Sequence, residues 1–137
     1  MVAKYADEWN CVNMQPETYQ HKLNVLTDPC NDLGRDISTV HQSMMAFGLV
    51  ADDEQTLDRF TKFHVNQMGA TGSPAAYRKA KATKGNWIVG LTNEVVDKLG
   101  KFASMGLEEV QLQHFNFASD EVPEYLADGI APRVAGL

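Results

Sequence analysis

Histidine is the side chain whose charge changes near neutral pH, so the histidines are the first candidates for acid–base chemistry. His114 lies late in the predicted strand from Leu107 to Phe117, and it is the weak candidate for a catalytic residue. It is either a pocket residue beside a ligand or a strand-end histidine that faces the helices. His64 lies on an apolar helix stripe, which favours a core or interface position. No histidine or cysteine pair has the spacing of a zinc site, so we expect no metal.

Polar and aromatic side chains near two strand ends are the candidates for ligand binding. Asn10 and Asn13 lie in and beside the loop that follows the first predicted strand. They either donate hydrogen bonds to a ligand or satisfy the backbone of their own loop. Gln113 and Phe115 alternate onto the same face of the last predicted strand. That face lines either a pocket or the core of a dimer, where a buried glutamine would need a partner.

Three other sets of residues have a structural and a functional interpretation. Trp9 and Trp87 can stack on a flat cofactor ring, but aromatic residues near strand ends more often anchor a core. The basic cluster from Arg78 to Lys84 can contact an anion, although a solvated helix face is favoured. Cys11 and Cys30 do not make a disulfide framework, so we expect reduced thiols.

The bulk composition limits the class of protein. A chain of 137 residues is expected to form a single domain, 1–137, with its own core. The net charge of −6 argues against a nucleic-acid partner, which would require a basic stripe. No apolar run approaches the roughly 20 residues that cross a membrane. The charged N-terminal segment does not resemble a signal peptide, so a cytoplasmic location is the expectation.

The periodicity predicts alternating strands and helices. Pro16 suits the first turn of a helix, whereas Pro29 predicts a break with Asp28 capping a second piece that ends at Gly34. The order strand, helix, strand, helix, helix, strand, helix is typical of a parallel α/β arrangement. Strands are predicted within residues 4–12, 40–49 and 107–117. Further helices are predicted after a capping pair at Asp52 and Gln55, over 75–83, from a Thr92 cap to Gly106, and from Pro123.

Four segments in register resemble the C-terminal portion of the luciferase-like monooxygenase family, the FMN- or deazaflavin-dependent barrels. Residues 5–10 (YADEWN) resemble the family's YADGWN strand, and residues 34–37 (GRDI) resemble its GRDP turn. Residues 89–95 (VGLTNEV) resemble its VGTPEEV helix start, and residues 107–115 resemble its closing strand. Ile37 and Asn93 replace family prolines, and Leu91 is an additional residue.

The resemblance implies a partial (β/α)8 barrel of about the last three βα units, with parallel strands and flanking helices. A whole barrel takes typically about 250 residues. In the family, the earlier strands supply much of the flavin pocket and the usual catalytic histidine. The resemblance implies FMN or deazaflavin as the cofactor, with Asn10 and Asn13 near its phosphate and His114 at the strand end where such barrels place their sites. The alternative is that no cofactor binds.

Three strands cannot close a barrel, so sheet edges and the inner sheet face are expected to be open. Open edges favour pairing with another chain, which predicts a homo-oligomer, specifically a dimer. The sequence therefore predicts a truncated relative of flavin-dependent oxidoreductases, with activity in doubt without the other half. The alternatives are a module that binds a small apolar molecule without redox activity, and a purely structural, self-associating chain.

Overall fold

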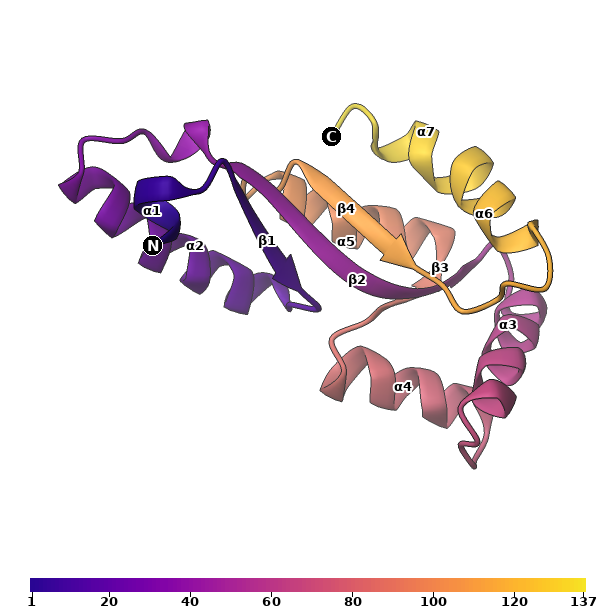
Figure 1. The fold of residues 1–137 in the computed structure, drawn as a ribbon. Coiled ribbons are helices and arrows are strands. Elements are labelled where there is room, and N and C mark those ends of the chain that lie inside the picture. The colour runs from indigo at the N-terminus through magenta and orange to yellow at the C-terminus, as the bar shows by residue number, and fades with distance from the viewer.

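The fold is built around one long strand, β2, that pairs with every other strand of the sheet. The computed structural model describes residues 1–137 (Figure 1). No helix combines the length and apolar character that crossing a bilayer requires. The elements in chain order are α1 (Val2–Tyr5), β1 (Glu8–Val12), α2 (Pro16–Asp32), the 3-10 turn η1 (Ile37–Thr39), β2 (His41–Ala51), α3 (Glu54–Gln67), α4 (Pro74–Lys84), β3 (Ile88–Leu91), α5 (Thr92–Ala103), β4 (Glu109–Gln113), α6 (Glu121–Tyr125), the π-helical turn η2 (Leu126–Ile130) and α7 (Ala131–Val134).

All three pairings of β2 are parallel, as the sequence predicts. β1 pairs from Glu8 opposite His41 onward, and β4 pairs from Glu109 opposite Ser43 onward. Both strands pair with the same stretch of β2, so they occupy its opposite edges. The short strand β3 pairs with the end of β2, over residues 48–51. The result is an open four-stranded parallel sheet with flanking helices, which confirms the predicted fold class.

One face of the sheet carries the main core. Met44 and Ala46 of β2 are fully buried on the side that packs against α2 and α5. Tyr19 of α2 is also fully buried, and its ring stacks on Trp9 at 5.5 Å between centroids. Phe102 of α5 meets the edge of the same tyrosine at 5.7 Å. Trp9 is therefore a core anchor, as favoured from the sequence.

A second, smaller core covers the carboxyl end of β2. Leu49 and Ala51 of β2 pack there with Leu57 and Phe60 of α3. Trp87, which directly precedes β3, is 7% exposed and belongs to the same core. The second tryptophan is thus also a core residue.

The helix break predicted at Pro29 is wrong, because α2 runs without interruption to Asp32. Proline removes the hydrogen bond to the carbonyl of Val25 and crowds that carbonyl, but Val25 is 54% exposed, so the carbonyl can tilt outward into water. Pro29 also lies in the last turn, where few later bonds depend on it. The predicted end at Gly34 is confirmed: its φ is +66°, and the Arg35 amide donates to the Cys30 carbonyl at 2.9 Å.

Two predicted caps are shifted by one residue. Asp53, not Asp52, caps α3 by accepting from the Thr56 amide at 2.8 Å. Thr92 is the first residue of α5, and the helix start is closed by Glu94, which accepts from the Leu91 amide at 2.9 Å. The short strand β3 was not predicted, and the last strand is only five residues long.

Candidate functional site

The face of the sheet that points away from α2 and α5 is the natural place to look for a site. In the first half of β2 this face is open, and its exposed side chains come from β1 and β4. We call this surface the open face; its exposed members are Glu8, Asn10, Val12, Glu109, Gln111 and Gln113.

Asn10 joins two strands on the open face. Its amide donates to the Ser43 hydroxyl at 2.7 Å, and that hydroxyl donates in turn to the carboxylate of Glu8. Ser43 is fully buried, so this chain of hydrogen bonds satisfies a hydroxyl that has little access to water. Asn10, which the sequence left as either a ligand donor or a partner of its own loop, thus donates to a serine of the neighbouring strand.

Asn13 replaces one rung of the sheet with its side chain. Its backbone amide donates to the Met45 carbonyl, and its side-chain oxygen accepts from the Phe47 amide at 3.0 Å. The residue has a φ of +45°, a conformation that asparagine tolerates better than most residues. Its side-chain nitrogen is the group that remains for a ligand.

Gln113 ends β4 on the open face. Its side-chain nitrogen lies 2.8 Å from the Met45 sulfur, a weak acceptor, and the side chain is exposed. Val110 and Leu112 point to the core side and are half-buried, so the predicted alternation along this strand is confirmed. Asn13 and Gln113 both flank β2 near Met45, at the carboxyl ends of β1 and β4.

Phe115 does not continue the strand but enters an aromatic cluster at the carboxyl end of the sheet. Its ring stacks on His64 at 5.0 Å and on Phe47 at 5.2 Å, and Trp87 lies 5.0 Å from Phe47. His64 is 4% exposed, which confirms the core position favoured from the sequence. We call this group the aromatic cluster; its members are Phe47, His64, Tyr77, Trp87 and Phe115.

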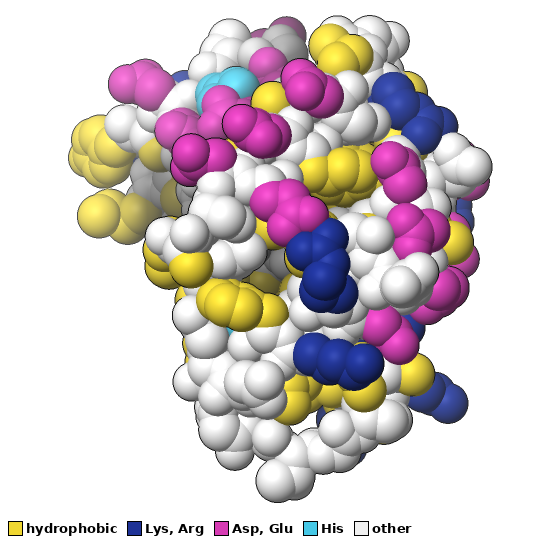
Figure 2. Space-filling model, turned by 90° about the vertical axis from the view of Figure 1, so that its right-hand side faces the viewer, with side chains coloured by type: hydrophobic (Ala, Val, Ile, Leu, Met, Phe, Trp, Pro, Cys, Tyr) yellow, Lys and Arg dark blue, Asp and Glu magenta, His cyan; other side chains and the backbone are white.

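Ion pairs fix the helices that surround this cluster. Arg78 of α4 pairs with Glu54 and Asp58 of α3 and is only 11% exposed. Arg59 of α3 pairs with Glu121 of α6 at 2.5 Å. Figure 2 shows acidic side chains at the upper left and along the right of the face seen there, interspersed with Lys and Arg side chains. Arg78 of the basic cluster therefore ties α4 to α3, rather than standing solvated or awaiting an anion.

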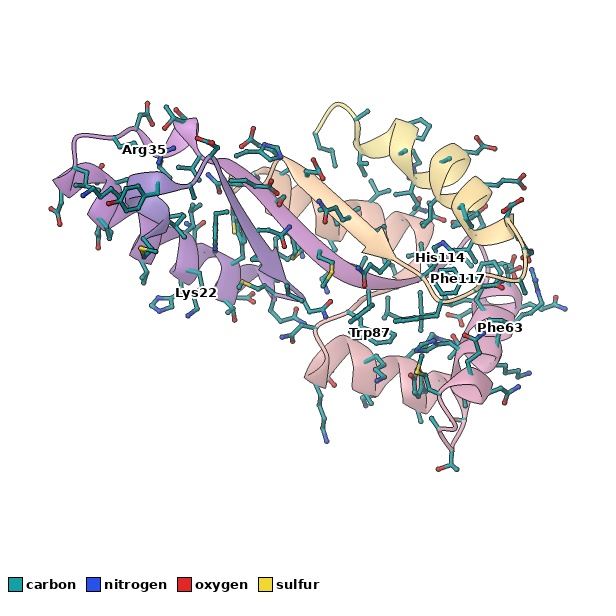
Figure 3. All side chains as sticks on the ribbon, viewed as in Figure 1. Lys22, Arg35, Phe63, Trp87, His114 and Phe117 are labelled. Carbon is teal, nitrogen blue, oxygen red and sulfur yellow. The ribbon has the colours of Figure 1, made fainter.

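A small pocket lies beside the aromatic cluster, with a volume of about 30 Å³. We call it the His64–His114 pocket, because both histidines line it. His64 Nε2 and His114 Nδ1 are buried and have no hydrogen-bond partner. Figure 3 shows His114 and Phe117 close together beyond the end of β4, with Phe63 on α3 nearby. Burial, aided by the charge of Lys81, lowers the pKa of His64, so this imidazole is neutral at neutral pH.

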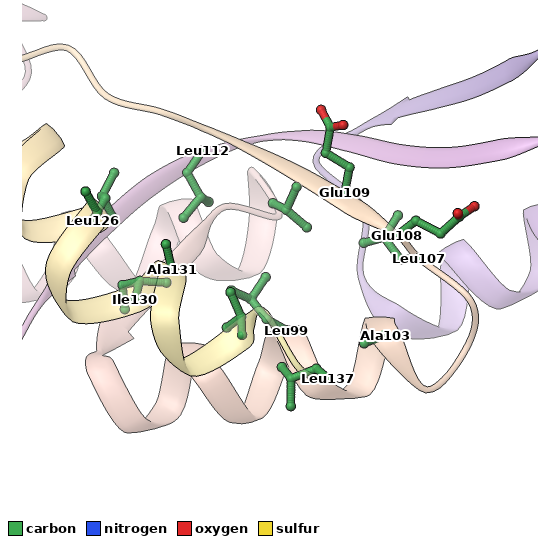
Figure 4. Close-up of a pocket in the computed structure, with 13 residues that line it drawn as sticks. Leu99, Ala103, Leu107, Glu108, Glu109, Leu112, Leu126, Ile130, Ala131 and Leu137 are labelled. Atoms are coloured by element: carbon green, nitrogen blue, oxygen red, sulfur yellow. The ribbon is translucent and has the colours of Figure 1, made fainter.

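A larger groove of about 370 Å³ lies between β4, α5 and the C-terminal helices (Figure 4). Its lining is apolar except for Glu108 and Glu109 at one end. The residues that line it are Leu99, Ala103, Leu107, Glu108, Glu109, Val110, Leu112, Leu126, Ala127, Ile130, Ala131, Val134 and Leu137. Sequence reasoning did not anticipate this groove, because the final helix and α5 had no predicted relative position.

At the amino end of the sheet, His41 lies between two carboxylates. Its Nδ1 is 3.4 Å from Glu108, and its Nε2 is 3.4 Å from Glu109. Desolvation opposes the charged form, but hydrogen bonds to Glu109 and Glu108 outweigh it and raise the pKa of His41. The only sequence feature that could have indicated these contacts is the pair of adjacent glutamates at the start of one strand together with a histidine at the start of another. No group of three or more ligating side chains is arranged to hold a metal ion.

The two cysteines are both buried and free, as predicted. Burial raises the pKa of Cys11 to about 11, so its thiol stays protonated and weakly reactive.

No protein-family model matches the sequence, and no characterised protein matches it by sequence alone. Solved structures do match the fold. A coenzyme F420-dependent tetrahydromethanopterin reductase from Methanopyrus kandleri aligns with 97% of this chain and 47% of its own, at 15% identity and a TM-score of 0.67. A monooxygenase from Streptomyces bottropensis aligns with 96% of this chain and 43% of its own, at 17% identity and a TM-score of 0.63.

A third structure, an F420-dependent secondary alcohol dehydrogenase with a bound F420-acetone adduct, aligns with 96% of this chain and 44% of its own, at 16% identity and a TM-score of 0.60. This chain thus spans about half the length of the structures that it matches. All three are luciferase-like enzymes. The chain therefore has the fold of part of a luciferase-like barrel, which confirms the predicted resemblance at the level of the fold.

Proposed function

We propose that this chain acts as one half of a luciferase-like oxidoreductase barrel that binds FMN or a deazaflavin once another half closes its sheet. The observation that carries the proposal is the fold match, which includes nearly all of this chain and only about half of each neighbour. Two of these neighbours are named for coenzyme F420, a deazaflavin. Fold likeness alone does not carry an activity, so the site residues must be tested directly.

The open face supports a partner that completes the barrel. β1 and β4 each have one edge without a neighbouring strand, and such edges favour pairing with further strands. Val12 on the open face is 49% exposed, and Phe117 just beyond β4 is 81% exposed. A second copy of this chain is the simplest partner, and an obligate interface would bury on the order of 2,000 Å² or more.

Asn13 and Gln113 are the residues best placed to hold the cofactor. Both lie at the carboxyl ends of strands, and each keeps a polar group that no strong internal partner occupies. Asn10 fits less well, because its amide is engaged by Ser43. Phe115 would form a wall of the site through its stacked aromatic cluster. When bound, the flavin supplies the redox chemistry, while these residues orient its ring and exclude water. His114 is the candidate for proton transfer.

Thermal unfolding at two protein concentrations, with and without FMN or coenzyme F420, tests the proposal. A cofactor that binds the folded state raises the melting temperature by mass action, and a dimer melts higher when it is more concentrated. Gln113→Leu should reduce the cofactor-dependent shift, whereas the control Gln111→Leu, on the same face but farther from the strand end, should not. If neither cofactor shifts melting at either concentration, the cofactor proposal fails.

The apolar groove supports a second candidate, a module that binds a small apolar molecule without redox chemistry. A volume of about 370 Å³ lies within the range of about 300–1,000 Å³ that is usual for ligand pockets. Ala131→Trp places a bulky side chain in the groove and should weaken binding of an apolar fluorescent probe such as anilinonaphthalene sulfonate. Ala135→Trp, also exposed but outside the groove, is the control. Equal probe binding by both variants would contradict this candidate.

A further inference from the structure

A polar hollow of about 470 Å³ lies between the start of α2 and the side of α5. We call it the Lys98 hollow. Apart from Pro16, every residue that lines it is polar or charged, and these residues are Gln15, Glu17, Glu94, Asp97, Lys98 and Lys101. It shares no residue with the open face, the proposed cofactor site or the apolar groove. Its chemistry is therefore separate from that of the sites described above.

The amine of Lys98 has no carboxylate partner. The side chain is half-buried, and its amine donates to the backbone carbonyl of Trp87 at 3.3 Å. No carboxylate forms an ion pair with Lys98 or with its neighbour Lys101. Glu94, one turn before Lys98 on α5, is engaged at the start of the helix, where its carboxylate accepts from the Leu91 amide at 2.9 Å. A reagent at the amine therefore has only one long hydrogen bond to displace.

The surroundings of the amine favour its uncharged form. Burial lowers the pKa of Lys98, whereas Glu17 opposes this change, and Lys101, one turn farther along α5, adds to it. A lysine is nucleophilic only as the uncharged amine, so a lowered pKa raises the reactive fraction at neutral pH. Lysines in such surroundings form Schiff bases with carbonyl compounds.

The lining also limits the kind of carbonyl compound. Three carboxylates line the hollow against two ammonium groups, so an anionic reagent meets an excess of like charge. An alkyl chain gains little there, because the walls offer almost no apolar surface. A hydroxyl group can donate to the carboxylates and accept from Lys101. Glu17 and Asp97 are further available to accept and return a proton. These features together favour a small, neutral aldehyde that carries a hydroxyl group.

We propose that Lys98 is a Schiff-base site for small neutral hydroxyaldehydes, which bind in the Lys98 hollow. The uncharged amine forms a C–N bond with the carbonyl carbon while the carbonyl π electrons move to the oxygen. A proton passes from the nitrogen to that oxygen and gives a carbinolamine. The C–O bond then breaks, and the hydroxyl leaves with the bonding pair and the second amine proton as water, so that an imine remains. No group is oxidised or reduced, so the reaction is independent of the flavin proposal.

Reductive trapping on the intact chain tests the site. Glycolaldehyde is added with cyanoborohydride, which reduces the imine to a stable secondary amine, and peptide mass spectrometry measures the rate of labelling at each lysine. Lys98 should be labelled several-fold faster than Lys22, an exposed lysine of α2 that lies outside the hollow. The rate at Lys98 should also saturate as the glycolaldehyde concentration rises. Equal, unsaturated rates at the two lysines would overturn the proposal.

Two further reagents test the chemical class. Propanal carries a methyl group in place of the hydroxyl of glycolaldehyde, so it should show a smaller preference for Lys98 over Lys22. An equal preference with propanal would overturn the role of the hydroxyl group. Acetyl phosphate represents the anionic reagents. Selective acetylation of Lys98, without selectivity for glycolaldehyde, would overturn the assignment to a neutral aldehyde.

A variant separates a binding site from a merely reactive amine. Glu17→Gln removes a carboxylate that raises the pKa of Lys98, so basicity alone would make labelling faster. If Glu17 holds the hydroxyl or transfers the proton, labelling of Lys98 by glycolaldehyde should instead become slower. Glu124→Gln, at an exposed carboxylate of α6 outside the hollow, is the matched control and should leave the rate unchanged. Faster labelling in Glu17→Gln would overturn the site and leave only a reactive lysine.

Discussion

The side-chain oxygen of Asn13 accepts a hydrogen bond from the backbone amide of Phe47 at 3.0 Å. Asn13 lies one residue beyond the last paired residue of β1. The side chain therefore extends the pairing of β1 with β2 after the backbone of β1 has turned away. This contact also fixes the start of the loop at the carboxyl end of the sheet. A residue first considered as a ligand donor thus has a structural role that does not exclude binding through its nitrogen.

Replacing Asn13 should separate its two structural contributions. Asn13→Gly keeps the backbone free at a φ of +45° but removes the acceptor, whereas Asn13→Ala also adds backbone strain. We expect Asn13→Ala to lower the free energy of unfolding by about 1–3 kcal/mol and Asn13→Gly by less. Urea unfolding measures both. Equal losses in the two variants would show that the backbone conformation contributes nothing.

The Tyr19 hydroxyl provides a test of the main core. It donates to the Gln42 side-chain oxygen at 2.6 Å, and both residues are buried. Tyr19→Phe leaves that oxygen without this donor, so the free energy of unfolding should fall by about 1–3 kcal/mol. Tyr5→Phe is the matched control, because Tyr5 is 68% exposed and should change stability little. An unchanged free energy of unfolding in Tyr19→Phe would show that water replaces the lost hydrogen bond.

His41 should make the protein more stable at mildly acid pH. Its raised pKa means that the folded state holds the proton more tightly than the unfolded state. The contribution is complete below the ordinary value of 6.5 and is lost as the pH rises through the folded pKa. The Glu109 pKa is lowered, first by Gln111 and then by His41, so its contribution is lost toward strong acid. The free energy of unfolding should therefore be higher at about pH 5.5 than at about pH 8 through the contribution of His41. His41→Gln should reduce this difference between the two pH values.

His64 should act in the opposite direction. Its pKa is lowered by burial, so the unfolded state binds a proton more readily and stability falls as the pH drops below 6.5. His64→Phe should remove that loss, and the variant should become relatively more stable than the parent at acid pH. The same pH series measures it. If His64→Phe and His41→Gln shift the pH profile in the same direction, one of the two assignments is wrong.

Self-association through the open face should respond to one added charge. Val12→Lys places a cation on the exposed apolar residue of β1, and we expect it to weaken a dimer by at least about tenfold. Val25→Lys is the control, because Val25 is similarly exposed, at 54%, but lies on α2. Sedimentation velocity over a concentration series measures both. Equal association in the two variants would place the interface elsewhere.

The elements with strong local signals could be predicted from the sequence. The uncharged run that forms β2, Pro16 at the first turn of α2 and the Gly34 ending each follow from local backbone chemistry. Pro29 was misjudged because the cost of an internal proline depends on the exposure of one carbonyl and the distance to the helix end. Asp52 accepts a hydrogen bond from the Thr92 hydroxyl at 2.6 Å instead of capping α3, and no local pattern reports this contact between distant segments.

The candidate site could be predicted only in part. Strand alternation correctly placed Gln113 and Leu112 on opposite faces of the sheet, because side chains alternate between faces in any strand. The engagement of Asn10 with Ser43 required the register between β1 and β2, which the sequence does not state. The meeting of His64 with Phe115 required the path of the chain after β4. Contacts between distant segments were thus the part that local patterns could not supply.

The central position of β2 also sets an order of events during synthesis. β1 leaves the ribosome before its only partner exists, because parallel neighbours are separated by a whole connecting helix. β4 follows β2 only after α3, α4, β3 and α5, so one side of β2 stays without its partner until those elements have been made. Nascent chains on neighbouring ribosomes expose the same side of β2 together. The interval before β4 arrives is therefore when mispairing between chains competes most with folding, and a chaperone that protects extended segments would act then.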